Sequence, residues 1–272
     1  MQEASGRAAA LMTADTRRAV RSLLFLLALA ANSVAAGAAD GHLVLAGGGS
    51  TPEVVFSRTL AISGGRNAIV AVLPQTFPDD SIGDAAVALW RQAGAREVVK
   101  VSRLDPAAAQ AAIRKATLIW MPGGFQGLLM TAIEGTPIAA EIRARFSAGV
   151  TIGGASAGAA AMSKIMIADE STANGAAVDG ARTSAGLGLW PEAIVSVHFT
   201  ERRRINPLRA IVRDHPTLLG VGLDEGTAVF VSGGSFAVVG RGTVTVVDPR
   251  GRDLDRPSVR TLSSGMRFRY RD

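Results

Sequence analysis

The sequence predicts an α/β protein in which a mostly parallel sheet is covered by helices on both faces. Apolar runs of four to seven residues alternate with segments of helical spacing, a pattern typical of βαβ units whose strands are buried on both sides. Beyond about residue 215, short β-rich runs separated by glycine predict a small C-terminal antiparallel meander. The 272 residues include no cysteine, so stability must come from the apolar core.

Five strands are expected in the parallel sheet, each a short run rich in Val, Ile or Leu. They cover residues 42–46, 67–73, 97–101, 118–121 and 150–153. Glycines 47–49 stop the first run, Pro74 closes the second, and Pro122 with two glycines halts the fourth. Such residues mark turns because of their restricted or permissive backbone angles.

Helices are expected between these strands at residues 82–93, 106–115 and 137–147. The last two begin with proline, which suits the first turn of a helix. Towards the C-terminus, residues 218–223 are expected to return as a strand to the main sheet. The runs 227–231, 236–239 and 243–247 would then form the meander, and the Arg-rich segment from Asp248 would be a solvated edge.

The N-terminal segment has the order of features of a secretory signal peptide. Arg17, Arg18 and Arg21 precede the apolar run 22–31, and small residues follow. The alternative, a membrane anchor, is disfavoured because this run is shorter than the roughly 20 residues that span a bilayer. We therefore expect cleavage near 36–38, with residues 1–38 lost and 39–272 remaining as one domain. The mature protein would be exported, periplasmic or secreted, without stable membrane insertion.

Ser156 lies in the pentapeptide Gly-Ala-Ser-Ala-Gly (154–158), between the strand 150–153 and an Ala- and Met-rich run at 159–166 that predicts a helix. A G-x-S-x-G sequence between a strand and a helix is the nucleophile elbow, which exposes the serine hydroxyl above the sheet. The helix N-terminus would offer free N–H groups to an oxyanion. Residues 183–186 repeat the letters without the first glycine or a preceding strand. The alternative for Ser156 is a glycine turn with an incidental serine.

A serine nucleophile needs a base, and the chain has three histidines. His42 begins the first strand, far from the carboxyl edge where such sheets place their sites. His215 follows a helical stretch and suits a helix C-terminus. His198 follows the apolar run 193–197 and therefore lies at the end of a strand, so it is the candidate base. A structural histidine is the alternative.

Four motifs, in order along the chain, resemble those of the cyanophycinases, serine peptidases related to peptidase E. They are residues 123–126, residues 154–159, the Gly-Leu-Gly-Leu run 186–189 that leads to His198 and Phe199, and residues 222–228. The resemblance implies a three-layer α/β/α sandwich of the class I glutamine amidotransferase-like type, with Ser in place of the usual Cys nucleophile. It implies a peptide substrate, cyanophycin or a β-aspartyl (isopeptide) bond, and a possible homodimer.

The same resemblance assigns roles to residues around the nucleophile. Gln126 would line the substrate pocket, and Gly124 and Ala157 would supply oxyanion-hole N–H groups. Arg202 and Arg204 would hold substrate carboxylates, a task that suits the guanidinium fork. The resemblance implies no cofactor and no metal.

The third catalytic residue of the family is acidic and follows the nucleophile in a loop. Asn174 stands at the matching place and cannot stabilise an imidazolium as a carboxylate does. Asp169 and Glu170 lie slightly earlier, and Glu170 is the preferred candidate, although a solvated loop pair is an equal alternative. Asp224 and Glu225 match the family and are expected to serve structure, not proton transfer.

Other departures concern specificity and competing functions. Ser196, Val197 and Pro207 replace residues that shape the family's pocket for the aspartyl and arginyl parts of the substrate, so strict β-aspartyl-arginine specificity is not expected. A catalytically impaired pseudoenzyme or binding protein on the same fold, or another acyl hydrolase, are the alternative functions. Nucleic acid is not an expected partner, because aromatic residues are 5% of the chain and interleave with no basic run.

Overall fold

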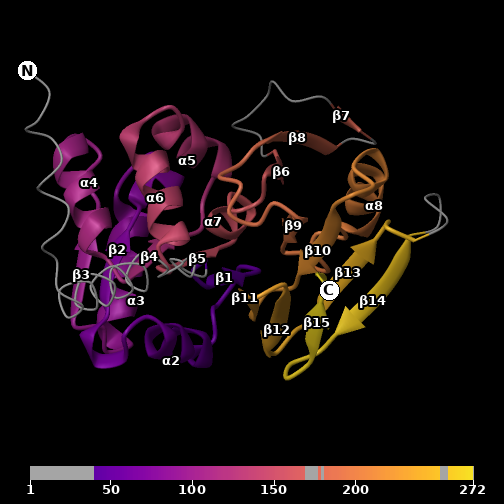
Figure 1. Ribbon diagram of the computed structural model, residues 1–272, viewed down its shortest axis with the longest axis horizontal. Helices are drawn as coiled ribbons and strands as arrows, with labels where there is room; N and C mark the ends of the chain where they lie inside the picture. Colours follow the sequence, from indigo (N-terminus) through magenta and orange to yellow (C-terminus); the bar gives the residue numbers. More distant parts are fainter. Residues whose placement is uncertain (1–39, 169–176, 179–180, 252–256, 272) are drawn as a thin grey trace, which may run out of the picture. The chain divides into compact units, whose positions relative to one another are not determined.

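An eight-stranded sheet forms the centre of the computed structural model, which describes residues 40–168, 177–178, 181–251 and 257–271. Its strand order is β15-β12-β11-β1-β5-β4-β2-β3 (Figure 1). The five parallel strands are β1 (Leu43–Ala46), β2 (Ile69–Val72), β3 (Glu97–Lys100), β4 (Leu118–Met121) and β5 (Thr151–Ala155). All five expected strands are thus present, each with ends within two residues of the expected ones.

Helices cover both faces of this sheet, as the alternating pattern predicts (Figure 1). Helices α2 (Glu53–Ile62) and α3 (Ser81–Gln92) pack on one face. Helices α4 (Pro106–Lys115), α5 (Gln126–Ile133) and α6 (Pro137–Ser147) pack on the other. Alternate residues of a strand serve the two layers: Ile119 joins the α4–α6 core, whereas Trp120 joins the α2–α3 core. Short 3₁₀ turns η1 (Gly65–Asn67) and η2 (Pro74–Thr76) flank β2.

The C-terminal strands divide between two sheets, which differs from the expected meander. Strands β11 (Thr227–Ser232), β12 (Ser235–Gly240) and β15 (Arg267–Arg269) extend the main sheet in antiparallel fashion. A second sheet has the order β14-β13-β10-β9, from β9 (Ala193–Val197), β10 (Leu219–Leu223), β13 (Val244–Asp248) and β14 (Ser258–Leu262). The expectation that 218–223 returns to the main sheet is therefore wrong.

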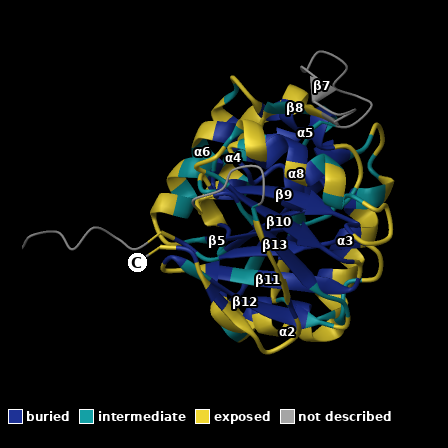
Figure 2. Ribbon diagram, turned by 90° about the vertical axis from the view of Figure 1, so that its right-hand side faces the viewer, coloured by how far each residue is buried: buried dark blue, intermediate teal, exposed yellow. Residues whose placement is uncertain are grey.

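The position of β10 in the second sheet follows from the side chains that pack against it. All of its residues are buried (Figure 2), so its apolar run does not distinguish one sheet from another. Its glycines select the second sheet, because a Cβ at Gly220 would meet Leu208 of α8 (Ile205–Asp214), and one at Gly222 would collide with the ring of Phe199. Strands β14 and β15, which follow Asp248, are mostly exposed edges, as expected.

The helix after Ser156 is much shorter than expected. α7 (Ala157–Ala160) has four residues, and the chain then forms β6 (Ile165–Ile167), which joins β8 (Ala181–Ala185) and β7 (Ala177–Val178) in a small third sheet. Ser163 lies between α7 and β6, and its hydroxyl accepts a hydrogen bond from the Val195 amide at 3.0 Å, which joins this segment to β9. Within the described residues, none of the helices combines the length and hydropathy that a membrane span needs.

Candidate active site

Ser156 occupies the sharp turn between β5 and α7. Its φ of 49° and ψ of −109° lie outside the regions that non-glycine residues favour, a strain common at functional positions. A Cβ at Gly154 would lie 2.6 Å from the carbonyl carbon of Gly158, and one at Gly158 would collide with the Met121 carbonyl oxygen. Both glycines of the pentapeptide are therefore required by close backbone approach. The turn has the strand–turn–helix form of the nucleophile elbow.

His198 lies one residue beyond β9, and its Nε2 is 2.7 Å from the hydroxyl oxygen of Ser156. Its amide donates to the Gly47 carbonyl at 2.9 Å, which ties the end of β9 to the end of β1. A Cβ at Gly48 would collide with the imidazole. The glycine run 47–49 is expected from the sequence only to end a strand; the absence of a side chain at Gly48 also leaves the space that the imidazole ring occupies. His215 caps the C-terminus of α8, as expected.

Glu225 completes a line of three side chains. Its Oε1 lies 2.5 Å from Nδ1 of His198, and its amide donates to the carboxylate of Glu201 at 3.1 Å. Glu225 is expected to serve structure and not proton transfer; beyond that expectation, its carboxylate contacts the ring of the candidate base. Glu170, the preferred acid, and its alternatives Asp169 and Asn174 lie outside the described residues.

A signal for Glu225 exists in the topology. β9 and β10 are parallel neighbours with Val197 opposite Leu223, so residues just beyond both strands meet at one edge. His198 comes one residue after β9, and Glu225 two residues after β10. An expectation that assigns 218–223 to the main sheet does not bring this carboxylate to the imidazole.

Asp224 has the structural role that sequence analysis assigns to it. Its two carboxylate oxygens accept four hydrogen bonds, from the hydroxyl and amide groups of Thr200 and Thr243, at 2.6 to 3.1 Å. Burial acts to raise the pKa of Asp224, but these hydrogen bonds together lower it below its usual value. The ionised side chain therefore fastens the turn after His198 to the start of β13.

Two amides next to the serine are placed to act as donors. Gly124 has a φ of 132° and follows β4, and Ala157 is the first residue of α7. Neither N–H makes a hydrogen bond to another described residue. The Gly158 amide donates to the Pro122 carbonyl at 3.2 Å, which joins the two turns. A helix of four residues adds little macrodipole, so stabilisation of an oxyanion here would depend on these N–H groups.

Ser156 and His198 line a cavity of about 490 Å³, here called the elbow cavity. Its other described lining residues are Gly48, Gly49, Ser50, Thr51, Phe56, Phe77, Ile82, Ala85, Ala86, Leu89, Trp120, Pro122, Gly123, Gly124, Ala155 and Arg202. A concave, largely apolar site that holds a nucleophile and a base is the form expected of an active site.

Of the three predicted substrate-binding side chains, only Arg202 lines the elbow cavity. Gln126 is buried, and its amide nitrogen donates to the carbonyl of Ile167 at 2.8 Å, so it supports β6. Arg204 is half-buried beside Arg202. Burial, followed by the charge of Arg202, lowers the pKa of Arg204.

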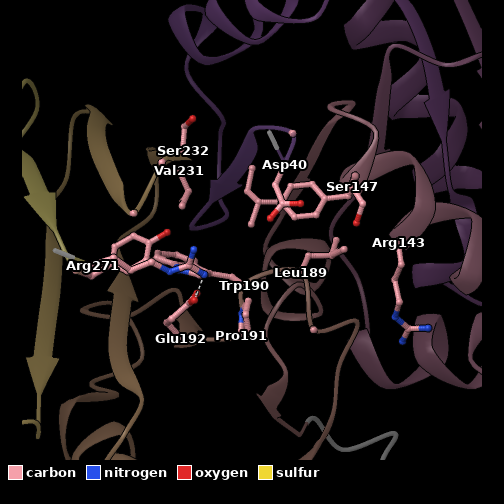
Figure 3. A pocket seen from close by; sticks show the side chains of 17 residues that line it. Asp40, Arg143, Ser147, Leu189, Trp190, Pro191, Glu192, Val231, Ser232 and Arg271 are labelled. Carbon is pink, nitrogen blue, oxygen red and sulfur yellow. Dashed lines mark hydrogen bonds and ion pairs between the residues drawn. The ribbon is translucent and has the colours of Figure 1, made fainter. Parts of the chain in front are cut away.

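A second cavity of about 460 Å³ shares no described lining residue with the elbow cavity. Figure 3 shows its charged side chains, among which Glu192 and Arg271 form an ion pair. Its described lining contains no histidine, so it has no base for a serine. Among the described residues, no group of three or more His, Asp or Glu side chains could hold a metal ion.

Comparison with known proteins gives a consistent result. The model of peptidase family S51 matches residues 43–239. A cyanophycinase of Geminocystis herdmanii (strain PCC 6308) is 38% identical over 220 residues, which cover 75% of this chain and 80% of that protein. A cyanophycinase of Synechococcus elongatus is 37% identical over 228 residues, 78% of this chain and 70% of that protein.

Two solved structures have the same fold. A peptidase from an acI-B1 Actinobacterium has a TM-score of 0.66 at 21% identity, and the match covers 86% of this chain and 98% of that one. A putative peptidase E protein from Listeria monocytogenes EGD-e has a TM-score of 0.58 at 16% identity, covering 75% and 100%. At this identity the likeness concerns the fold alone, and it confirms the predicted fold class.

Proposed function

Because the chain belongs to peptidase family S51 and is a peptidase, as its motifs indicate, we propose that it hydrolyses cyanophycin or β-aspartyl (isopeptide) bonds through an acyl-enzyme on Ser156. The name of the relatives, cyanophycinase, supports the substrate class. The mechanism is carried by one observation: two hydrogen bonds join Ser156 to His198, and His198 to Glu225. A nucleophile, a base and a group that orients the base are the parts that serine catalysis needs.

In the first half of the reaction the Ser156 oxygen attacks the scissile carbonyl carbon, and His198 Nε2 takes the hydroxyl proton. Glu225 accepts a hydrogen bond from the Nδ1–H group of His198, which fixes the tautomer whose Nε2 can accept a proton, and its charge stabilises the imidazolium that forms. The carbonyl oxygen becomes an oxyanion, which receives hydrogen bonds from the N–H groups of Gly124 and Ala157. When the intermediate collapses, the C–N bond breaks and the imidazolium proton passes to the leaving amine.

In the second half, water replaces the amine. His198 takes a proton from a water molecule as the water oxygen attacks the acyl carbon. The second tetrahedral intermediate then collapses, the bond from the acyl carbon to the Ser156 oxygen breaks, and His198 returns the proton to that oxygen. The products are the acid and the amine, and the enzyme regains its starting state. No step draws on a cofactor.

Arg202 is proposed to bind a substrate carboxylate. Its side chain lines the elbow cavity and forms no hydrogen bond or ion pair with another described residue. An arginine in a cleft with its donors free is suited to bidentate contact with a carboxylate of an aspartyl peptide. Arg204, half-buried beside it, adds positive charge to this end of the site.

Chemical labelling and hydrolysis assays together test the proposal. We expect a fluorophosphonate probe to label Ser156 in the purified protein, and Ser156→Ala and His198→Ala to abolish labelling. We expect release of product from cyanophycin or from β-aspartyl dipeptides. If Ser156 is labelled but none of these substrates is hydrolysed, the proposed substrate class is wrong and the protein is an acyl hydrolase of another specificity. Absence of labelling in the folded protein would remove the serine mechanism.

We also propose that the enzyme is exported, on the basis of the basic and apolar N-terminal segments alone. The mature form would contain residues 39–272 as one domain. Mass spectrometry of the N-terminus of protein recovered outside the cytoplasm should give a chain that begins near residues 37–39. A homodimer is proposed from the family resemblance, and light scattering during size-exclusion chromatography would measure it.

A further inference from the structure

One wall of the elbow cavity is apolar. Helix α3 lines it with Ile82, Ala85 and Leu89, which share one face because they are spaced by three and four residues. Phe56 from α2 and Trp120 from β4 line the same cavity. The side chains beside the reacting serine are therefore hydrocarbon over a large part of the site.

Aromatic packing fixes this wall. Trp90 of α3 packs edge-on against Phe56 and Trp120, with ring centroids 4.9 Å and 5.0 Å apart. Edge-to-face contacts of this kind stabilise one arrangement of the rings. The apolar surface is thus formed before a substrate arrives, as in most small-molecule sites.

The apolar surface continues to solvent. Leu89 is 48% exposed, and Phe125 is 38% exposed and stacked on Phe77, with ring centroids 6.0 Å apart. Exposed large apolar side chains that gather at a cleft mark a binding surface. An apolar substrate side chain that binds here would bury apolar surface of both the substrate and the protein.

The charge of the cavity is positive. Among Asp, Glu, Lys and Arg, Arg202 is the one side chain on its described lining. The carboxylates nearest the catalytic line are engaged, because Glu225 binds the imidazole of His198 and Glu201 accepts from the Glu225 amide. A guanidinium side chain of a substrate would meet a like charge here.

The acidic residues at the start of α3 are also engaged. Asp80 binds Lys100 and Arg103, and Asp84 binds Lys100. Asp79 accepts hydrogen bonds from the amide and hydroxyl of the first residue of α3. These contacts lower the pKa values of Asp79 and Asp80 below their usual range. The carboxylates closest in sequence to the apolar wall are therefore bound to other groups and are not on the cavity lining.

We propose that the elbow cavity selects β-aspartyl peptides whose leaving residue carries an apolar side chain, and disfavours arginine at that position. This inference rests on the proposed function and favours the second of its two substrate classes, β-aspartyl peptides, over the arginine-bearing cyanophycin. Burial of a leucine or phenylalanine side chain in such a pocket corresponds to a preference of about 10- to 100-fold in kcat/KM over a side chain that gains no burial. The arginine that a cyanophycin-type substrate carries would meet no carboxylate on the described lining of this cavity.

Matched dipeptides test the preference directly. The protein is assayed for kcat/KM on β-aspartyl-leucine, β-aspartyl-phenylalanine and β-aspartyl-arginine, with fluorophosphonate labelling of Ser156 as the measure of active enzyme. We expect the first two to exceed the third by about 10- to 100-fold. A higher value for β-aspartyl-arginine overturns this inference and leaves the proposed function intact. Hydrolysis of none of the three overturns this inference, and the proposed function falls with it only if cyanophycin is not hydrolysed either.

A charge placed on the wall should reverse the preference. Leu89→Glu and, as a second variant, Ala85→Glu each add a carboxylate at a residue that lines the cavity and is exposed. Each should lower the ratio of leucine to arginine activity at least tenfold. Leu104→Glu is the matched control, since Leu104 is 95% exposed and outside the cavity lining, and it should leave the ratio unchanged. If both wall variants fold and keep the wild-type ratio, the wall does not set specificity and the inference is overturned.

Discussion

Replacing Glu225 by Gln removes one charge beside the imidazole of His198 and leaves the shape of the side chain intact. In one orientation the amide nitrogen would donate to Nδ1, which places the ring proton on Nε2 and prevents it from accepting the Ser156 proton. In the other orientation a hydrogen bond remains, but the charge that stabilises the imidazolium is lost. Loss of the acidic partner in a buried serine triad costs on the order of 10⁴ in rate. The Glu225 side chain is 41% exposed, so water replaces part of its effect and we expect a loss of about 10² to 10³.

The assay is kcat/KM on a β-aspartyl dipeptide, together with the rate of fluorophosphonate labelling of Ser156. Both should fall in Glu225→Gln, because both require proton transfer from the serine. The thermal midpoint should stay within a few degrees of wild type, since the substitution changes an exposed carboxylate to an amide of equal size. Glu170→Gln is the matched control, and it should keep activity within about threefold of wild type.

The opposite result would refute the reasoning. If Glu170→Gln loses the activity and Glu225→Gln retains it, the carboxylate that acts on His198 during turnover is not the one that contacts it in the structure. The loop acid favoured by the sequence would then regain the role.

Three further substitutions address the parts around this line. Gly48→Ala should lower kcat/KM by about 10² or more, because the new Cβ collides with the imidazole of the candidate base. Gly94→Ala is the control: Gly94 is also at positive φ, but a Cβ there would have no atom within 4 Å. This control should affect stability alone, by about 1 kcal/mol in thermal melts. Asp224→Asn should destabilise the protein by about 2 to 4 kcal/mol at pH 7, since an amide repels some of the four donors, and lower the thermal midpoint by about 5 to 10 °C. The pKa of this carboxyl is lower in the folded protein than in the unfolded chain, so its contribution to the free energy of unfolding is complete above the unfolded pKa of about 3.9 and is lost as the pH falls through the folded pKa. The difference in stability between wild type and Asp224→Asn should therefore narrow below about pH 4. A difference that stays constant with pH would contradict this account. Arg202→Ala should raise KM for β-aspartyl dipeptides by about 10-fold or more, whereas Arg203→Ala, one residue along and absent from the cavity lining, should not.

The parallel sheet could be predicted from the sequence because its strands are short apolar runs bounded by Gly and Pro. Strands that are buried on both faces are continuously apolar and do not alternate with polar residues, which is the pattern seen here. Helices α2 and α5 were missed, since both follow glycine-rich turns that mark the end of a strand without indicating what comes next. The sheet to which β10 belongs could not be predicted. That depends on the packing of Phe199 and α8 against its glycines, a tertiary contact that the apolar pattern of the strand does not encode.

The nucleophile and the base were proposed from local context, and the structure brings Ser156 and His198 together. The carboxylate contact of Glu225 could not be proposed, because the letters Asp-Glu after a strand do not say which side chain points inward. The structure separates them: the threonines hold Asp224, and Glu225 reaches the ring. Gln126 was carried over from the resemblance and lies off the cavity, where it bonds to Ile167.

The nucleophile stands at the end of β5 in the main sheet, whereas the imidazole and its carboxylate stand at the ends of β9 and β10 in the second sheet. Activity therefore depends on the relative position of two sheets that have separate strand ladders and are joined near the site by the hydrogen bond from the His198 amide to the Gly47 carbonyl. In a titration with urea, a slight loosening of one half against the other separates proton donor from acceptor while each sheet keeps its own ladder. Turnover should accordingly vanish at lower denaturant than the circular dichroism of the strands.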